Sequence, residues 1–410
     1  MKQLTYTHSF SGFPLRKPLV LQIKERETLF EKELRQYILE TFLGKQSKLA
    51  AFTLENESTT ALVKYLYVYG SRSHWSLYND VCWVYKFCQF LKTSPDQILK
   101  ECIDKKEYGK PAAIANVRQH LEDYIAYLSV KGVAPSTKCR VCNTIVRFFG
   151  INDIKLHIPY RMHVHTAYEY RAPTLEEILK VLTVASIRDK FVIAALASGG
   201  FRSGTLSKLK YRHVKNDLES GTVPVHVHVE AAITKGKLRD YSTFLCQDAV
   251  DYLKAYLDSR KKGVGLYRPE EIIDESPLIR GRGRTTKPLS TDSLENLVRE
   301  LFYKTKIIPK GVIGRPNELK AHSFRKFFQT ELASGGVHPD FIDYMMGHRG
   351  NKYSDVKSKG IEYLRDIYIS AGLSLQPKTK ESRVAALVGV IRRWGFEPKE
   401  VLKPEFIRFH

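Results

Sequence analysis

The spacing of apolar residues constrains the fold of this chain more than any other feature of its sequence. Over residues 55–158, and again over much of 171–372, apolar side chains recur every three or four residues, the period of amphipathic helices. One stretch departs from this period. Val223–Ala232 is rich in alternating β-branched residues, and Asp240–Leu245 continues that pattern after a turn. We therefore predict a mostly α fold with a small β-sheet, formed by a β-hairpin inside a helical domain.

The length of the chain predicts more than one domain, because 410 residues exceed what one ordinary hydrophobic core organises. Ser58 and Thr59 are possible N-caps of an early helix, and Thr174 with Glu177 forms a capping-box sequence. An apolar stripe near the C-terminus either packs on its own domain or docks onto a neighbouring protomer. The predicted divisions are an N-terminal extension without an assigned role (1–54), a helical domain (55–158), a linker (159–170), a second domain (171–372) and a tail with an amphipathic helix (373–410).

The charge balance indicates the class of partner. Lys and Arg number 66 and Asp and Glu 44, which gives a formal net charge of +22. Because this excess is spread along the chain, we expect a broad surface that contacts nucleic-acid phosphates. A basic membrane-surface protein would need an amphipathic anchor, and we find none at the N-terminus, nor a secretory signal or an apolar run long enough to cross a bilayer. We therefore expect a cytoplasmic, nucleoid-associated protein.

The six cysteines do not predict a metal site. Only Cys139 and Cys142 have the spacing of metal ligands, and a zinc site needs four ligands, yet no second pair follows. We therefore predict reduced thiols and neither a metal nor another cofactor. The glycine- and arginine-rich loop at 281–284 lacks the spacing of a phosphate-binding P-loop, so we expect it to contact DNA phosphate or simply to be solvated.

Two segments of the second domain each supply one cation. A glycine-rich bend precedes Arg202 and places this arginine at the start of a helix. Lys235 lies at the tip of the predicted hairpin, where Lys237 competes with it. Alone, such an arginine is usually a surface residue and such a lysine an ordinary turn residue, so the two gain meaning only in combination with other residues.

Two further segments supply histidines, an arginine and a tyrosine. His322 and Arg325 are three residues apart, so both side chains are expected to project from one face of a helix. His348 follows Gly347 in a turn, and Tyr353 comes five residues later. Alone, His322 and Arg325 could be a helix-surface pair and His348 could cap a helix end, so these residues too gain significance only from the set.

The order of these segments resembles that of the tyrosine recombinase, or phage-integrase, family. The helix with His322 and Arg325, followed by the turn at Gly347 and His348, is the most specific part of the resemblance. It covers roughly residues 55–372. The resemblance implies a helical core-binding domain that contacts DNA, joined to the α+β catalytic domain of this family.

The resemblance also implies a reaction. Two arginines hold the non-bridging oxygens of the scissile phosphate, a tyrosine attacks phosphorus to give a 3′-phosphotyrosine, and a lysine protonates the leaving 5′ oxygen. The covalent bond conserves the phosphoester energy, so neither ATP nor metal is needed. The residues implied are Arg202 and Arg325 for the phosphate, Tyr353 as nucleophile, Lys235 as general acid, and His322 and His348 for hydrogen bonds to phosphate or for the tyrosine proton.

The choice of nucleophile has rivals. Tyr353 lies closer to His348 than is usual in the family. Tyr363 and Tyr368 lie in the stretch 361–368, which is similar to the helix after the nucleophile in archaeal integrases, the closest branch of the family. Both read as packing residues of a helix. We favour Tyr353, because a loop can reposition a nucleophile between strand-cleaving states.

The implied function is site-specific recombination or integration of double-stranded DNA. Recombination by this chemistry joins two duplexes, so the resemblance also implies a DNA-dependent homo-oligomer of four protomers. One alternative is a type IB topoisomerase-like relaxase, which would only relax supercoils. Another is a non-catalytic DNA-binding protein on a recombinase fold, which would tolerate the loss of Tyr353.

Overall fold

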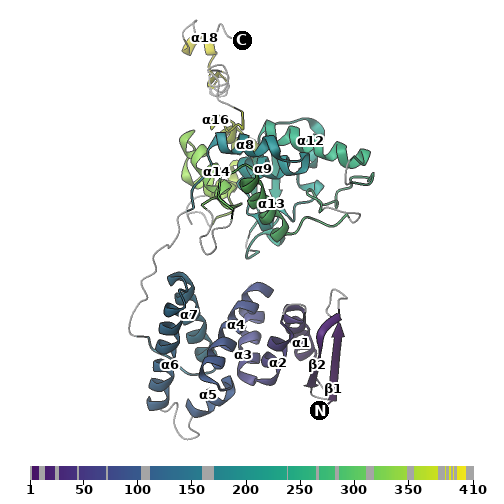
Figure 1. Ribbon diagram of the computed structural model, residues 1–410. Helices are drawn as coiled ribbons and strands as arrows, with labels where there is room; N and C mark the ends of the chain where they lie inside the picture. The colour runs from purple at the N-terminus through teal and green to yellow at the C-terminus, as the bar shows by residue number, and fades with distance from the viewer. Residues whose placement is uncertain are drawn as a thin grey trace. The chain divides into compact units, whose positions relative to one another are not determined.

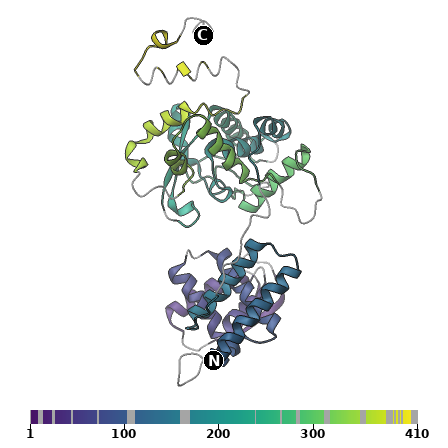
Figure 2. The same ribbon diagram turned by 90° about the vertical axis from the view of Figure 1, so that its left-hand side faces the viewer.

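The chain divides into two compact units, Met1–Ala167 and Tyr168–His410, in a computed structural model (Figures 1 and 2). Each unit is described by itself. The residues that the structure describes are 2–8, 14–23, 27–43, 46–70, 73–102, 111–158, 170–237, 239–264, 267–281, 286–310, 318–348, 355–376, 384, 387–388, 391 and 395–402. Nearly all of the predicted linker, most of the basic loop and Tyr353 lie outside these residues.

The described residues of the first unit are mostly helical and include a two-stranded antiparallel sheet near the N-terminus (Figure 1). Its core holds apolar residues from both sides of residue 55, for example Phe42 and Leu49 together with Leu62 and Val81. The predicted extension 1–54 therefore contributes to the same core as the helices after it. The described elements are β1 (Lys2–His8), β2 (Pro14–Ile23), α1 (Leu29–Phe42), α2 (Ser47–Glu55), α3 (Glu57–Tyr69), α4 (His74–Leu91), α5 (Pro95–Cys102), α6 (Pro111–Val130) and α7 (Pro135–Ile151).

The start of α3 corrects one prediction. Ser58 and Thr59 are not its N-caps, because the helix begins at Glu57 and Asn56 occupies the cap position. The carboxylate of Asp96 on α5 accepts the backbone N–H groups of Glu57 at 2.9 Å and Ser58 at 3.0 Å. A side chain from a different helix thus satisfies the free donors of this terminus, which local sequence does not reveal.

The second unit is built around a buried helix, α9 (Ile187–Gly199). All of its residues except Ile187 and Lys190 are buried, and it packs against helices before and after it in the chain. The other helices are α8 (Leu175–Val184), α10 (Ser203–Leu206), α11 (Lys215–Ser220), α12 (Gln247–Lys262), α13 (Thr291–Lys304), α14 (Ser323–Ser334), α15 (Pro339–Met345), α16 (Ile361–Ser370) and α18 (Pro398–Val401). Figure 1 shows α9 with α8, α12, α13 and α14 around it.

Two local predictions in the second unit are confirmed. Thr174 and Glu177 form a reciprocal capping box at the start of α8. The predicted hairpin is present as β3 (Val225–Val229) and β4 (Tyr241–Leu245), which pair antiparallel. The fold is thus mostly α with small sheets, as the apolar spacing predicts. Within the described part of the chain, no helix has the length and apolar character that crossing a membrane would require.

Candidate active site

A bend in the backbone positions Arg202. Gly200 has φ +59°, in the left-handed region, and a Cβ atom there would lie 2.5 Å from the ring of Phe328. Glycine is therefore the residue that fits this close approach. The chain then turns so that Arg202 occupies the N-cap position of α10, as predicted. Arg202 is half-buried, and its Nη1 donates a long hydrogen bond of 3.4 Å to the carbonyl of Gly347.

Arg325 is the most enclosed residue of the site. It lies on α14 and is 1% exposed. Its guanidinium donates to the carbonyl of Gly200, to the carbonyl of Met346 at 2.9 Å, and to Nε2 of His348 at 2.9 Å. Burial, followed by the positive charge of Arg202, lowers the pKa of Arg325 to about 10. Two arginines therefore lie close enough to repel one another.

That repulsion indicates an anion site. Among the described residues, neither Arg202 nor Arg325 forms an ion pair with a carboxylate. Bringing two guanidinium groups together costs free energy unless an anion joins them. A phosphate with two non-bridging oxygens fits two planar forks, so the pair is suited to a phosphodiester.

His348 lies in the turn after α15. Its backbone N–H donates to the carbonyl of Asp343, and its ring Nδ1 lies 2.9 Å from the Asp343 carboxylate. Gly347 has φ +64°, and a Cβ there would lie 2.6 Å from the ring of Tyr241. The glycine thus lets the turn lie against β4 and bring His348 up to Arg325.

His322 occupies the N-cap position of α14, three residues before Arg325. The residue is exposed, and its ring meets that of Tyr170 edge-on with centroids 5.5 Å apart. Partial loss of hydration, and then the positive charges of Arg325 and Lys320, lower the pKa of His322 to about 4. His322 is therefore neutral near pH 7 in the absence of DNA. We refer to Arg202, His322, Arg325 and His348 as the basic cluster.

The structure does not join the two remaining predicted residues to the basic cluster. Lys235 is exposed on the connection between β3 and β4, and no hydrogen bond among the described residues ties it to the cluster. Tyr353 lies outside the described residues. The roles of both therefore stay predictions.

The rival tyrosines on α16 differ from one another. Tyr368 is 1% exposed, and its hydroxyl donates to the carbonyl of Ser198 at 2.9 Å. Tyr363 is 46% exposed, although its ring also contacts Phe341. Only Tyr368 is thus a fully buried packing residue, because Tyr363 lies on the outer face of the helix.

Two residues of the site were missed in the sequence. Asp343 contacts His348 from the preceding helix, and Tyr241 is buried with the charges of Arg325 and Arg202 within electrostatic reach. Burial raises the pKa of Tyr241, and the two arginines oppose this shift. An acidic residue shortly before a functional histidine was the available signal for Asp343. For Tyr241 the sequence predicted a place in a strand and nothing that indicated a position near the two arginines.

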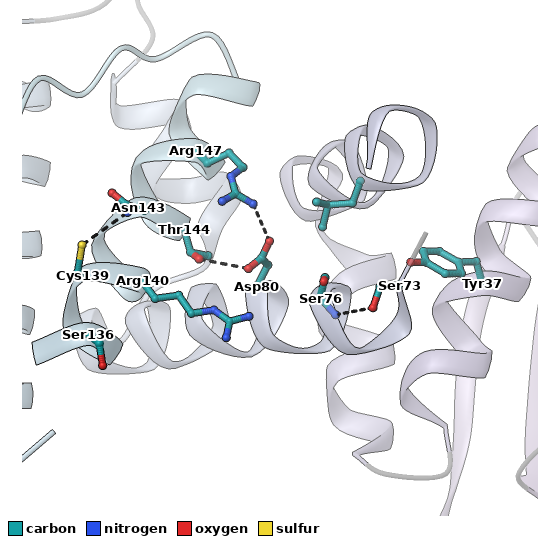
Figure 3. A pocket seen from close by; sticks show the side chains of 11 residues that line it. Tyr37, Ser73, Ser76, Asp80, Ser136, Cys139, Arg140, Asn143, Thr144 and Arg147 are labelled. Atoms are coloured by element: carbon teal, nitrogen blue, oxygen red, sulfur yellow. Dashed lines mark hydrogen bonds and ion pairs between the residues drawn. The ribbon is translucent and has the colours of Figure 1, made fainter. Parts of the chain in front are cut away.

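The first unit contains a separate polar pocket of about 470 Å³ between α4, α7 and neighbouring helices (Figure 3). Figure 3 shows Arg140 and Arg147 reaching from α7 toward Asp80 of α4. Arg147 donates to Asp80 at 2.9 Å, and Thr144 donates at 3.2 Å. Burial raises the pKa of Asp80, with the two arginines opposing it. Arg140 is exposed, so the pocket has a cation available to a second anion.

Comparison with known proteins now bears on the second unit. The family model described as "Phage integrase family" matches residues 171–354. The match spans less than half of the chain and lies within the second unit. All four members of the basic cluster lie within it, and so do Lys235 and, at its end, Tyr353.

Curated relatives match a shorter stretch than the phage integrase family model does. Two proteins named tyrosine recombinase XerC, from strains OSU 85-389 and RML369-C of Rickettsia bellii, are each 29% identical over 105 residues. That stretch is 25% of this chain and 31% of each relative, so the chain spans about a third of their length. The relatives support the tyrosine recombinase family, and the archaeal branch is not shown.

Solved structures are less similar to this chain in sequence than the curated relatives are. A crystal structure of XerA recombinase is 20% identical and covers 83% of this chain and 98% of that chain, with a TM-score of 0.34. A lambda integrase tetramer bound to a Holliday junction is 17% identical and covers 86% and 94%, with a TM-score of 0.45. With TM-scores below 0.5, these likenesses add nothing to the phage integrase family match.

Proposed function

We propose that this chain is a site-specific DNA recombinase or integrase that cleaves and rejoins double-stranded DNA through a 3′-phosphotyrosine. One observation carries the proposal. Within the stretch that the phage integrase family model matches, two arginines lie together without a carboxylate partner among the described residues, and two imidazoles adjoin them. The net charge of +22 supplies the wider attraction to DNA. As in the named relatives, the proposed reaction class is tyrosine recombination.

The proposed chemistry divides among the residues as follows. Arg202 and Arg325 neutralise the phosphate, and this preorganised charge stabilises the transition state. Tyr353 attacks phosphorus, and Lys235 gives a proton to the 5′ oxygen that leaves. His322, neutral near pH 7, donates one hydrogen bond from its single ring N–H to the phosphate. Religation is the same reaction in reverse, with the 5′ hydroxyl as nucleophile.

A covalent adduct tests the proposal. The purified chain is incubated with a library of nicked duplexes of random central sequence, in which the short cleaved strand diffuses away and traps the intermediate. We expect a protein–DNA band that survives denaturing electrophoresis, and sequencing of the attached strand then gives the target site. If the wild-type chain binds DNA but leaves no such band, a non-catalytic DNA-binding protein is the better description.

The adduct alone does not separate recombination from relaxation. On plasmids that carry two copies of the recovered site, we expect exchange of strands between the sites and a DNA-dependent assembly of four protomers. Relaxation of supercoils by a monomer, without exchange, would instead favour a type IB topoisomerase-like relaxase. A chain acting this way resides with the DNA of the cell.

Lys235→Ala is expected to slow cleavage by roughly 10²-fold or more, since general acids contribute on that scale. A substrate whose leaving group is a 5′ thiol needs no protonation, so we expect it to restore the rate. The measurement is single-turnover adduct formation on matched oxygen and sulfur substrates. Lys237→Ala, two residues away on the same exposed connection, is the control. If the 5′-thiol substrate restores the rate of the Lys237 variant and not that of the Lys235 variant, Lys237 is the general acid.

Arg140→Ala is expected to weaken DNA binding about equally for all sequences. If Arg140 contacts a backbone phosphate, its loss reduces the slope of log K against log salt by about 1. The measurement is binding of unrelated duplexes at several salt concentrations. Arg118→Ala is the control, because Arg118 is an arginine of the same unit that lies on α6 and pairs with Glu122. An unchanged slope in the Arg140 variant would show that the pocket does not contact DNA phosphate.

A further inference from the structure

The ring of His348 is held at both nitrogens. Nδ1 lies 2.9 Å from Oδ1 of Asp343, and Nε2 lies 2.9 Å from Nη2 of Arg325. An arginine N–H can only donate, so Nε2 is the acceptor in this contact. The single proton of the neutral ring is then on Nδ1, where it is donated to the Asp343 carboxylate.

Asp343 also sets the charge around this ring. The groups that face His348 from other elements are Arg325 on α14, Arg202 through the Gly347 carbonyl, Tyr241 against Gly347, and His322 within electrostatic reach. Two of these are cations and two are neutral near pH 7. Among the described residues that contact the ring, Asp343 alone brings a negative charge. An imidazolium at position 348 would be repelled by the two arginines, and this carboxylate offsets that repulsion.

The two imidazoles of the basic cluster therefore have different surroundings. His322 is surrounded by Arg325, Lys320 and Arg202, and its lowered pKa makes it a weak proton acceptor. His348 has a carboxylate on the far side of the ring from Arg325. A carboxylate behind an imidazole fixes the tautomer and stabilises the charge that forms when the ring takes a proton.

We propose that Asp343 is a positioning residue that holds His348 with its unprotonated Nε2 directed toward Arg325, so that His348 accepts the proton of the attacking tyrosine. The inference rests on the proposed function. It assigns the tyrosine proton to one of the two histidines and adds a residue to the site.

The proton and bond balance is complete. A phosphate oxygen competes for the Arg325 N–H that now contacts His348, which releases Nε2. The phenol oxygen forms its bond to phosphorus while its proton passes to Nε2, and the resulting imidazolium is shared with Asp343. The bond from phosphorus to the 5′ oxygen breaks, its electron pair stays on that oxygen, and the oxygen takes a proton from Lys235. Religation returns both protons.

The tautomer can be measured without any reaction. The full-length chain is labelled with ¹⁵N-histidine, and the His348 signals are identified by their absence in His348→Gln. We expect Nδ1 to carry the proton in the DNA-free protein. A proton found on Nε2 would overturn the inference, whatever the protein does to DNA.

The kinetic test uses Asp343→Asn in single-turnover adduct formation across pH. We expect at least about 100-fold slower cleavage, in the range seen for groups that orient a functional histidine. Because the imidazolium loses its carboxylate, the acid limb of the pH–rate profile should also move to lower pH. Asp343→Glu keeps the charge and should restore part of the rate with the limb near its wild-type place.

A matched control lies on the same helix. Asp340 of α15 contacts His338 and lies outside the basic cluster, so Asp340→Asn should keep the wild-type rate and profile. If Asp343→Asn behaves like this control, or loses rate without movement of the acid limb, the inference is overturned. Absence of an adduct from the wild-type chain would instead remove the proposed function, and the tautomer measurement would still decide the role of Asp343.

Discussion

Arg325→Ala is expected to abolish cleavage and to destabilise the protein, whereas Arg202→Ala is expected to abolish cleavage alone. In the proposed mechanism both arginines neutralise the phosphate in the transition state, and comparable groups contribute about 10³-fold or more to phosphoryl transfer. We therefore expect adduct formation to fall by roughly that factor in either variant. Most DNA affinity should remain, because other phosphate contacts supply it.

The difference in stability follows from burial. Arg325 is 1% exposed and donates to the carbonyls of Gly200 and Met346. Its removal leaves two buried carbonyls without a partner, at about 1–3 kcal/mol each. Arg202 is half-buried and makes one long bond to Gly347, so its removal costs less and also relieves the repulsion on Arg325.

Three measurements check this pair of variants: single-turnover adduct formation, DNA affinity and unfolding by urea. Arg299→Ala is the control, since Arg299 is an exposed arginine on α13 that contacts its helix neighbour Asn296. We expect it to leave all three near wild type. A loss of DNA affinity that parallels the loss of cleavage in Arg202→Ala would contradict the separation of catalysis from binding.

Tyr353→Phe is expected to eliminate the covalent adduct, because no other group would then form the bond to phosphorus. The loss should be complete within the detection limit of a denaturing gel, with DNA affinity kept. A reaction that continues in this variant would show that a different tyrosine is the nucleophile.

The tyrosines of α16 supply the controls. Tyr363→Phe should keep the adduct if Tyr353 is the nucleophile; loss of the adduct in Tyr363→Phe alone would assign the role to Tyr363, which is 46% exposed. Tyr368→Phe should keep the adduct and lower the free energy of unfolding by about 1 kcal/mol, since it deletes a buried hydrogen bond to Ser198. Cleavage lost in Tyr368→Phe without loss of stability would contradict the packing role of this residue.

Local chemistry made several features predictable from the sequence. The capping box of Thr174 and Glu177 forms within one turn of helix, and the hairpin β3–β4 follows from alternation and a short connection. Arg202, His322, Arg325 and His348 were selected as candidate site residues because short sequence motifs occur in the order of the family. Each of these motifs is contiguous in the chain. Such signals depend on residues near one another in the chain, so they can be recognised without knowing which segments pack together.

The contacts that make these residues a site come from tertiary structure. Arg325 is fixed by carbonyls of Gly200 and Met346, and main-chain carbonyls have no signature in a sequence. Asp343 contacts the ring of His348 only because the chain turns after α15 and brings His348 back over it. The same holds for Asp96, which caps α3 from another helix. It also holds for residues before 55, which were predicted as an extension without an assigned role and which join the core of the later helices. The sequence by itself determined which chemical groups this protein has. Packing decided which of them meet, because burial and long-range hydrogen bonds depend on segments that are far apart in the chain.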